Sequence, residues 1–156
     1  MKNLFTNVIA VHANATEVKA MLADPTQMLK WIPEIDTVTE DQNQFQIIRQ
    51  TTALNQSEMI TVTTAADSIT YHSTEGRLAY DLTFTFTTAD DQTVVTETLA
   101  VPESTDTHLP LKLLAPIAKH AFYENLTNFA TLVERLAYET KWKLHNETVA
   151  QKSRRF

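Results

Sequence analysis

Few side chains in the sequence could contact a ligand, and one of them, Asn125, has apolar neighbours. Asn125 is expected at the centre of the apolar face of a long helix, between Phe122 and Phe129. A buried amide requires hydrogen-bond partners. Asn125 is therefore either an anchor for a bound ligand, or a residue that bonds to a neighbouring strand or to a trapped water.

Three further side chains are candidates for ligand contact. Tyr80 lies among the apolar residues of a predicted strand, so its hydroxyl could reach a cavity or be satisfied within the core. Trp31 could line a cavity mouth, or it could pack a short helix onto the core. Arg49 alternates with Phe45 and Ile47. If that face of the strand is concave, the guanidinium could hold an oxyanion; if the face is convex, Arg49 is exposed.

The other titratable side chains show no catalytic or metal-binding pattern. The five histidines lack metal-ligand spacing; they are His12, His72, His108, His120 and His145. His108 precedes the long helix and is a candidate for an entry loop. Paired carboxylates such as Asp90-Asp91 fall in predicted turns, where solvent keeps pKa values ordinary. We therefore predict no catalytic residue, no metal and no cofactor.

Composition and charge indicate one globular domain with a basic extension. The chain has 156 residues, a net charge of −6 and no cysteine. The absence of cysteine excludes a disulfide framework, an iron–sulfur cluster and a cysteine nucleophile. Residues 141–156 carry a net charge of +4, from five Lys or Arg against Glu147, which leaves −10 on residues 1–140. An acidic body disfavours nucleic-acid binding.

We accordingly expect a single domain over residues 1–140 and a basic C-terminal extension over 141–156. This extension is expected to be a solvated, partly frayed end, or to touch an anionic surface or another acidic body. No apolar run approaches the roughly 18 residues that span a membrane, and the N-terminus lacks the features of a signal peptide. We expect a cytoplasmic protein.

A set of strands and one long helix must position these side chains. The apolar pattern predicts a strand over 4–12, then two short helices separated by Asp24-Pro25. From about 35 onward the period changes to two, and we expect strands at 35–40, 44–52, 57–64, 68–74, 77–88 and 92–101. Their short connections imply an antiparallel meander. After Pro110 and Pro116 the pattern predicts an amphipathic helix to about residue 140, which covers the sheet.

This order of elements resembles the START-like (SRPBCC) superfamily, and in particular its bacterial polyketide-cyclase-like members. The segments that carry the resemblance are 11–18, 22–25, 31–35 and 125–134. Residues 41–44 lack the glycine-rich loop of the pollen-allergen-type members. The resemblance implies an α+β helix-grip fold with about seven strands. It also implies a cavity between the long helix and the concave face of the sheet.

The cavity that the resemblance implies leads to three hypotheses. In the first, which we favour, the protein binds a small hydrophobic molecule without catalysis. The expected ligand-binding residues are Asn125, Tyr80, Trp31, Phe122, Phe84, Phe129 and Arg49. In the second, the protein is a polyketide cyclase/dehydratase-like enzyme in which Asn125, Tyr80 or Arg49 polarises a carbonyl. In the third, phenylalanine side chains fill the cavity and the protein is an interaction module.

Overall fold

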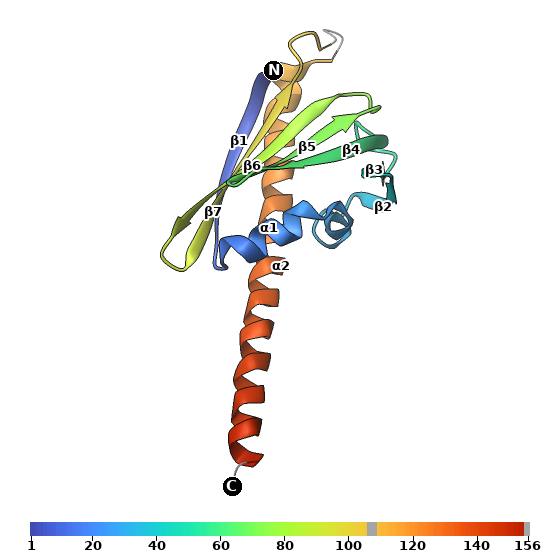
Figure 1. Cartoon of the computed structure of the whole chain (residues 1–156). Coiled ribbons are helices and arrows are strands. Elements are labelled where there is room, and N and C mark those ends of the chain that lie inside the picture. The colour runs from blue at the N-terminus through green and yellow to red at the C-terminus, as the bar shows by residue number, and fades with distance from the viewer. Residues whose placement is uncertain (106–108, 155–156) are drawn as a thin grey trace.

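The fold consists of one antiparallel sheet and a long helix that crosses its concave face, as Figure 1 shows for the computed structural model. The structure describes residues 1–105 and 109–154. The strands are β1 (Lys2–Val11), β2 (Ile35–Asp41), β3 (Gln44–Arg49), β4 (Ser57–Thr64), β5 (Ser68–Thr74), β6 (Tyr80–Ala89) and β7 (Gln92–Val101). The helices are α1 (Ala15–Ala23), the 3₁₀ helix η1 (Pro25–Lys30) and α2 (Leu111–Arg154). The predicted α+β helix-grip fold is confirmed.

The sheet is a meander of β2 to β7, and β1 pairs with β7 to form one edge of the sheet. Its seven strands follow the order β1-β7-β6-β5-β4-β3-β2, and every neighbouring pair is antiparallel. In β6 the buried side chains alternate with Asp81 and then with threonines; the buried ones are Tyr80, Leu82, Phe84 and Phe86. This is the period of a strand with one covered and one wet face.

Two predicted strands are shorter than expected, and Asn55 explains one of them. The strand predicted over 77–88 begins at Tyr80. Leu78 donates its N–H to Asn55 Oδ1 at 2.8 Å and accepts from Asn55 Nδ2 at 2.8 Å. The side-chain amide thus takes the place of a neighbouring strand. The strand predicted over 44–52 ends at Arg49 because the chain then turns, with the Ala53 N–H bonded to the Gln50 carbonyl.

The turn between β2 and β3 shows how the chain forms a tight hairpin without glycine. Gln42 and Asn43 have φ values of 49° and 67°. A two-residue type I′ turn requires positive φ at both central positions, and its backbone twist matches that of the flanking strands. Asn adopts positive φ more readily than most residues, whereas Gln has no such preference. Glu75 also adopts a positive φ, of 66°.

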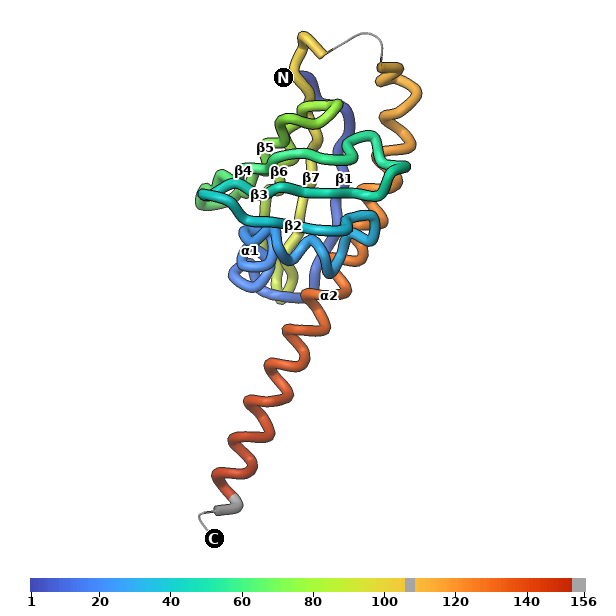
Figure 2. The backbone as a smooth tube through the Cα atoms, turned by 90° about the vertical axis from the view of Figure 1, so that its right-hand side faces the viewer, coloured from blue at the N-terminus to red at the C-terminus, as the bar shows by residue number. Residues whose placement is uncertain are grey.

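The long helix α2 has two parts that differ in packing. Leu126, Phe129 and Val133 are fully or almost fully buried against the sheet. Ala137 is the last buried residue of the helix, and every residue from 138 to 152 is exposed. Figure 2 shows that α2 continues well past the end of the sheet.

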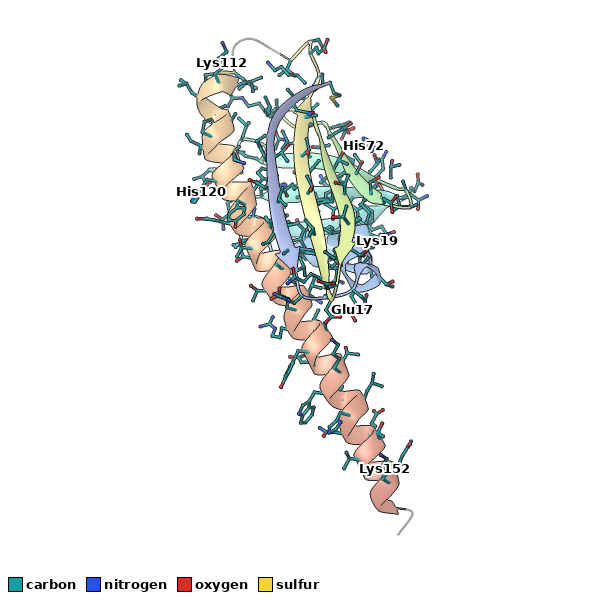
Figure 3. All side chains as sticks on the ribbon, turned by 90° about the vertical axis from the view of Figure 1, so that its left-hand side faces the viewer. Glu17, Lys19, His72, Lys112, His120 and Lys152 are labelled. Atoms are coloured by element: carbon teal, nitrogen blue, oxygen red, sulfur yellow. The ribbon has the colours of Figure 1, made fainter. Side chains whose placement is uncertain are left out.

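The predicted end of the helix near residue 140 is therefore wrong. Residues 138–154, which we call the projecting segment, are helical and not frayed. They contain neither proline nor glycine, the two residues that most strongly disfavour a helix. Residues 138–152 are exposed, and Figure 3 shows no other element beside them.

Candidate ligand-binding site

A groove lies between the first part of α2 and the concave face of the sheet. Its volume is about 280 Å³. On the helix side its lining includes three alanines, Ala115, Ala118 and Ala121. One to two turns later, larger residues such as Leu126 and Phe129 fill the corresponding space. The groove therefore exists because α2 presents small side chains to the sheet at this end of the helix.

The groove has apolar walls and a polar floor. The remaining apolar lining residues are Leu4, Phe5, Ala53, Leu54, Leu78, Leu99, Leu111, Leu114, Ile117 and Phe122. The polar lining residues are Glu34, Arg49, Thr52, Asn55, Glu58 and Tyr80. Mostly apolar walls with a few convergent polar groups are typical of sites for small molecules.

Arg49 is the cation of the groove floor. Its side chain is only 8% exposed, so the strand face that carries Arg49, Ile47 and Phe45 is the concave one. Arg49 Nε and Nη2 lie 2.8 and 2.7 Å from Glu58 Oε1, and Nη1 bonds to Glu34. Burial lowers the pKa of Arg49, but the electrostatic effects of Tyr80, Glu58 and Glu34 outweigh it and raise this pKa above its ordinary value. Two carboxylates therefore already face the guanidinium that the sequence suggested as an oxyanion anchor.

Glu58 is held on all sides by polar partners. Its side chain has no exposed surface. Oε2 accepts a hydrogen bond from Asn55 Nδ2 at 3.2 Å and another from the Ser73 hydroxyl. Gly76 lies against Asn55, so closely that a Cβ atom there would stand 2.7 Å from Asn55 Cγ. The single glycine of the chain thus leaves the space that the Asn55 side chain needs.

A second, smaller cavity lies deeper under α2 than the groove. Its volume is about 10 Å³, the size of one water-sized atom. Its lining residues are Met28, Trp31, Ile32, Arg49, Ile60, Tyr71, Tyr80, Leu82, Glu97, Phe122 and Asn125. Arg49, Tyr80 and Phe122 also line the groove, so these three side chains separate the two spaces. We call this space the inner cavity.

One residue that lines the inner cavity, Trp31, carries an unpartnered donor. Trp31 is 3% exposed, and its ring packs edge-on against Phe129 with centroids 5.3 Å apart. Among the described residues, Trp31 Nε1 is the one buried side-chain nitrogen or oxygen that lacks a hydrogen-bond partner. Half-buried Asn125 lines the same cavity.

Glu97 is a buried acidic residue that lines the inner cavity. It is 1% exposed, and Oε1 accepts a hydrogen bond from Asn7 Nδ2 at 3.2 Å. Asn7 is held in turn by α2, because its Oδ1 accepts from Lys119 Nζ at 3.0 Å. Burial raises the pKa of Glu97 to about 7, although Asn7 and Lys119 favour the ionised form. Both charge states of Glu97 are therefore accessible near neutral pH.

The two tyrosines of the inner cavity remain protonated. Burial is the main cause that raises the pKa of Tyr71 and of Tyr80 above its ordinary value. The Tyr71 hydroxyl donates to the backbone carbonyl of Leu22 on α1. Tyr80 is close to Glu58 and Ser73, which both affect its pKa through hydrogen bonds. Both phenols are thus neutral hydrogen-bonding groups.

The structure brings most of the sequence-predicted site residues together. Arg49, Tyr80 and Phe122 line both spaces, and Trp31 and Asn125 line the inner cavity. Two predicted residues, Phe84 and Phe129, line neither space, because both are completely buried in the core. His108, the candidate for an entry loop, lies outside the described residues.

Three further candidate residues were not predicted: Glu58, Asn55 and Glu97. The alternation that identified Arg49 could have found two of them. Glu97 stands between Val95 and Leu99 at the two-residue spacing of a buried strand face, and Glu58 precedes Ile60 at the same spacing. Asn55 lies in a turn, and no periodic signal marks it.

His72 and His120 lie away from these two spaces. His72 bonds through Nδ1 to Asp81 and through Nε2 to Thr63, each at 2.9 Å, on the outer face of the sheet. His120 lies on the side of α2 that faces away from the sheet, as Figure 3 shows. Within the described part of the chain, no three His, Asp or Glu side chains are grouped as metal ligands would be. Nor does any helix there have an apolar stretch that could cross a membrane.

The chain belongs to a known family. Residues 4–134 match the family described as "Polyketide cyclase / dehydrase and lipid transport". This match ends just before the projecting segment. No curated protein matches the chain.

Solved structures with the same fold are distant in sequence. A START superfamily protein from Mycobacterium smegmatis is 18% identical with a TM-score of 0.61, over 87% of this chain and 97% of that one. The ZhuI aromatase/cyclase from Streptomyces sp. R1128 is 18% identical with a TM-score of 0.63, over 84% and 93%. The Aha1 dimer from Colwellia psychrerythraea is 14% identical with a TM-score of 0.62, over 86% and 97%. These similarities show the fold alone.

Proposed function

We propose that the protein binds a small hydrophobic molecule in the groove between α2 and the sheet. The observation that carries this proposal is the alanine-lined side of the helix, which leaves about 280 Å³ of space above apolar walls. This volume is at the lower end of ligand sites, which typically enclose about 300–1,000 Å³. The ligand is therefore small. The family description, which names lipid transport, supports a hydrophobic ligand.

The alternative of a filled interior applies to only one part of the molecule. Leu126, Phe129 and Val133 are fully or almost fully buried under the middle of α2. Leu113 and Ile117, in the first part of the helix, are 73% and 68% exposed. In a helix that only covers a core, large apolar side chains such as these usually face the core. The contrast supports a site at this end of the helix.

Mass spectrometry of an organic extract from the purified protein tests the proposal. We expect a discrete compound in stoichiometric amount. Ala118→Trp places an indole in the groove and should abolish the signal. Thr131→Trp, on an exposed position of the same helix, is the matched control and should retain it. If neither extraction nor added apolar probes reveals binding, the proposal is wrong.

One observation favours a second candidate, a cyclase/dehydratase-type enzyme. The three groups that such a reaction would use, Asn125, Tyr80 and Arg49, all line the inner cavity. Glu97 adds a carboxyl whose pKa of about 7 suits a general acid or base. Incubation with a poly-β-ketone thioester analogue tests this function. A cyclised product that the wild type forms and Glu97→Gln does not would support it, and no product from the wild type would contradict it.

A further inference from the structure

The inner cavity is large enough for one atom, and three of the residues that line it can form hydrogen bonds. Its volume of about 10 Å³ admits a single oxygen-sized atom. Its lining residues include Trp31, whose buried N–H has no partner, together with Asn125 and Glu97. An indole N–H can only donate, an amide can donate or accept, and an ionised carboxylate can only accept. One atom that accepts from Trp31 and donates to Glu97 satisfies this set, and a hydroxyl oxygen does both.

Packing does not account for the buried carboxyl group of Glu97 or for the unpartnered N–H of Trp31. Glu97 occupies an inward-facing position of β7 between Val95 and Leu99, where an apolar side chain would be the stable choice. Burial of a polar group without a full set of hydrogen bonds is costly. Trp31 adds a second such group beside the same space. Two costly buried groups at one cavity indicate that the cavity receives a polar partner.

The charges around the cavity disfavour an anionic partner. The positive charge of Arg49 is already faced by Glu34 and Glu58. Glu97 contributes a third carboxyl, and Lys119 lies beside Asn7 on the side of the helix. No cation is thus left over for a ligand carboxylate or phosphate, and any such group would be repelled by Glu97 when it is ionised.

We propose that the inner cavity binds the hydroxyl group of a neutral, hydrophobic alcohol or phenol whose apolar body lies in the groove. This inference rests on the proposed function and names the class of ligand. The groove and the inner cavity share Arg49, Tyr80 and Phe122 as a wall, so the hydroxyl group of the ligand must reach past these three side chains. Trp31 donates to the hydroxyl oxygen, Asn125 bonds to it, and the hydroxyl proton points to Glu97.

Four probes of similar shape test the proposal by calorimetry at neutral pH. They are 2-naphthol, 2-methoxynaphthalene, 2-methylnaphthalene and 2-naphthoate. One added hydrogen bond in a desolvated site should make 2-naphthol bind about tenfold more tightly than 2-methylnaphthalene, equivalent to roughly 1.4 kcal/mol. The methoxy compound can accept but not donate, and it should bind less tightly than 2-naphthol. The anion should bind weakest.

Variants assign this preference to the inner cavity. Trp31→Phe retains a ring against Phe129 but removes the N–H, and it should reduce the preference for 2-naphthol to about threefold or less. Asn125→Leu should act in the same way, and it provides a second test if Trp31→Phe fails to fold. Trp142→Phe is the matched control, because Trp142 is 58% exposed on the projecting segment. It should leave the preference unchanged.

The outcomes separate the inference from the proposed function. If all four probes bind with equal affinity, the inner cavity does not recognise a hydroxyl, and the inference is wrong while the proposed function stands. If 2-naphthoate binds most tightly, Arg49 acts as an anion anchor and the inference is also wrong. If none binds and the native extract is empty, the proposed function and the inference fail together. A preference for 2-naphthol that survives Trp31→Phe and Asn125→Leu also contradicts the inference.

Discussion

Arg49 and Glu58 form a buried ion pair in which two guanidinium nitrogens contact the same carboxylate oxygen. Nε and Nη2 of Arg49 lie 2.8 and 2.7 Å from Oε1 of Glu58. The Glu58 side chain is 0% exposed and that of Arg49 is 8% exposed. Such a pair contributes little net stability compared with apolar residues of the same size, but the loss of one partner leaves a buried charge unpaired. The pair therefore fixes the floor of the groove.

Loss of one member of this pair should strongly destabilise the protein. We expect Glu58→Gln to lower the free energy of unfolding by about 3 kcal/mol in a urea titration. Arg49→Met should have a similar effect, and the double variant Arg49→Met/Glu58→Met should cost less than the sum of the two. Glu34→Gln is the control, with an expected cost within about 1 kcal/mol, because the Glu34 side chain is 45% exposed. Equal effects of Glu34→Gln and Glu58→Gln would contradict this account.

Gly76 should tolerate no side chain. A Cβ atom at this position would stand 2.7 Å from Asn55 Nδ2, the atom that binds Glu58 and the Leu78 carbonyl. We expect Gly76→Ala to lower the free energy of unfolding by about 1–3 kcal/mol through loss of these buried hydrogen bonds. At the neighbouring position, Glu75→Gly should instead raise stability by up to about 1 kcal/mol, since Glu75 has a φ of 66°. Thermal unfolding of both variants checks the two opposite signs.

Glu97 should make stability depend on pH. Its pKa is raised from 4.5 to about 7 in the folded protein, so the folded chain holds this proton more strongly than the unfolded chain. The stabilisation is fully present below about pH 4.5 and is lost as pH rises through about 7. A pKa difference of this size corresponds to roughly 3 kcal/mol.

Glu97→Gln isolates this contribution. The variant should be more stable than the wild type at pH 8, and that advantage should shrink or vanish at pH 4.5. Urea titrations at both pH values measure it. Glu124→Gln, at a 65% exposed side chain on α2, is the control and should follow the wild type. The same pH dependence in the wild type and Glu97→Gln would show that Glu97 does not ionise as inferred.

The projecting segment should contribute little to folding. Because residues 138–152 bury no side chain, a stop codon after Thr140 should change the free energy of unfolding by less than about 1 kcal/mol. Leu126→Ala, in the packed part of the same helix, should cost roughly 2–5 kcal/mol. Circular dichroism on heating compares the two. A large loss on truncation would show that the segment packs against something, such as a second copy of the chain.

The sequence predicted the fold well because periodicity reports burial. The alternation of Leu82, Phe84 and Phe86 with threonines appears in the structure as one buried and one exposed face of β6. One error falls where a side chain replaces a regular backbone partner. Asn55 bonds to both backbone groups of Leu78 and so delays the start of β6, and this contact between distant residues leaves no periodic signal.

The candidate site was less predictable because it depends on which face of each strand is concave. The alternation placed Arg49 on the same strand face as Ile47, but it could not show whether that face is concave or convex. Arg49 could therefore be predicted either as a ligand anchor or as an exposed residue. Glu97 and Glu58 were missed because charged residues are rarely fully buried. Their burial is understandable only from the structure, in which Asn7 donates a hydrogen bond to Glu97 and Asn55 donates one to Glu58. The size of the groove depends on three alanines of α2, and nothing local distinguishes them from other alanines of a helix.

The projecting segment gives the molecule a large electric dipole moment. Residues 1–140 carry a net charge of −10 and residues 141–156 carry +4. Lys141, Lys143 and Lys152 lie along α2 beyond the body, and Figure 3 shows Lys152 near its far end. At 1.5 Å per residue, this segment separates the two charges by roughly 20 Å. Near a negatively charged surface, this dipole orients the protein with its projecting segment toward the surface. Near a positively charged surface, it orients the body of the protein toward the surface. The net charge of −6 alone would predict only repulsion from a negatively charged surface.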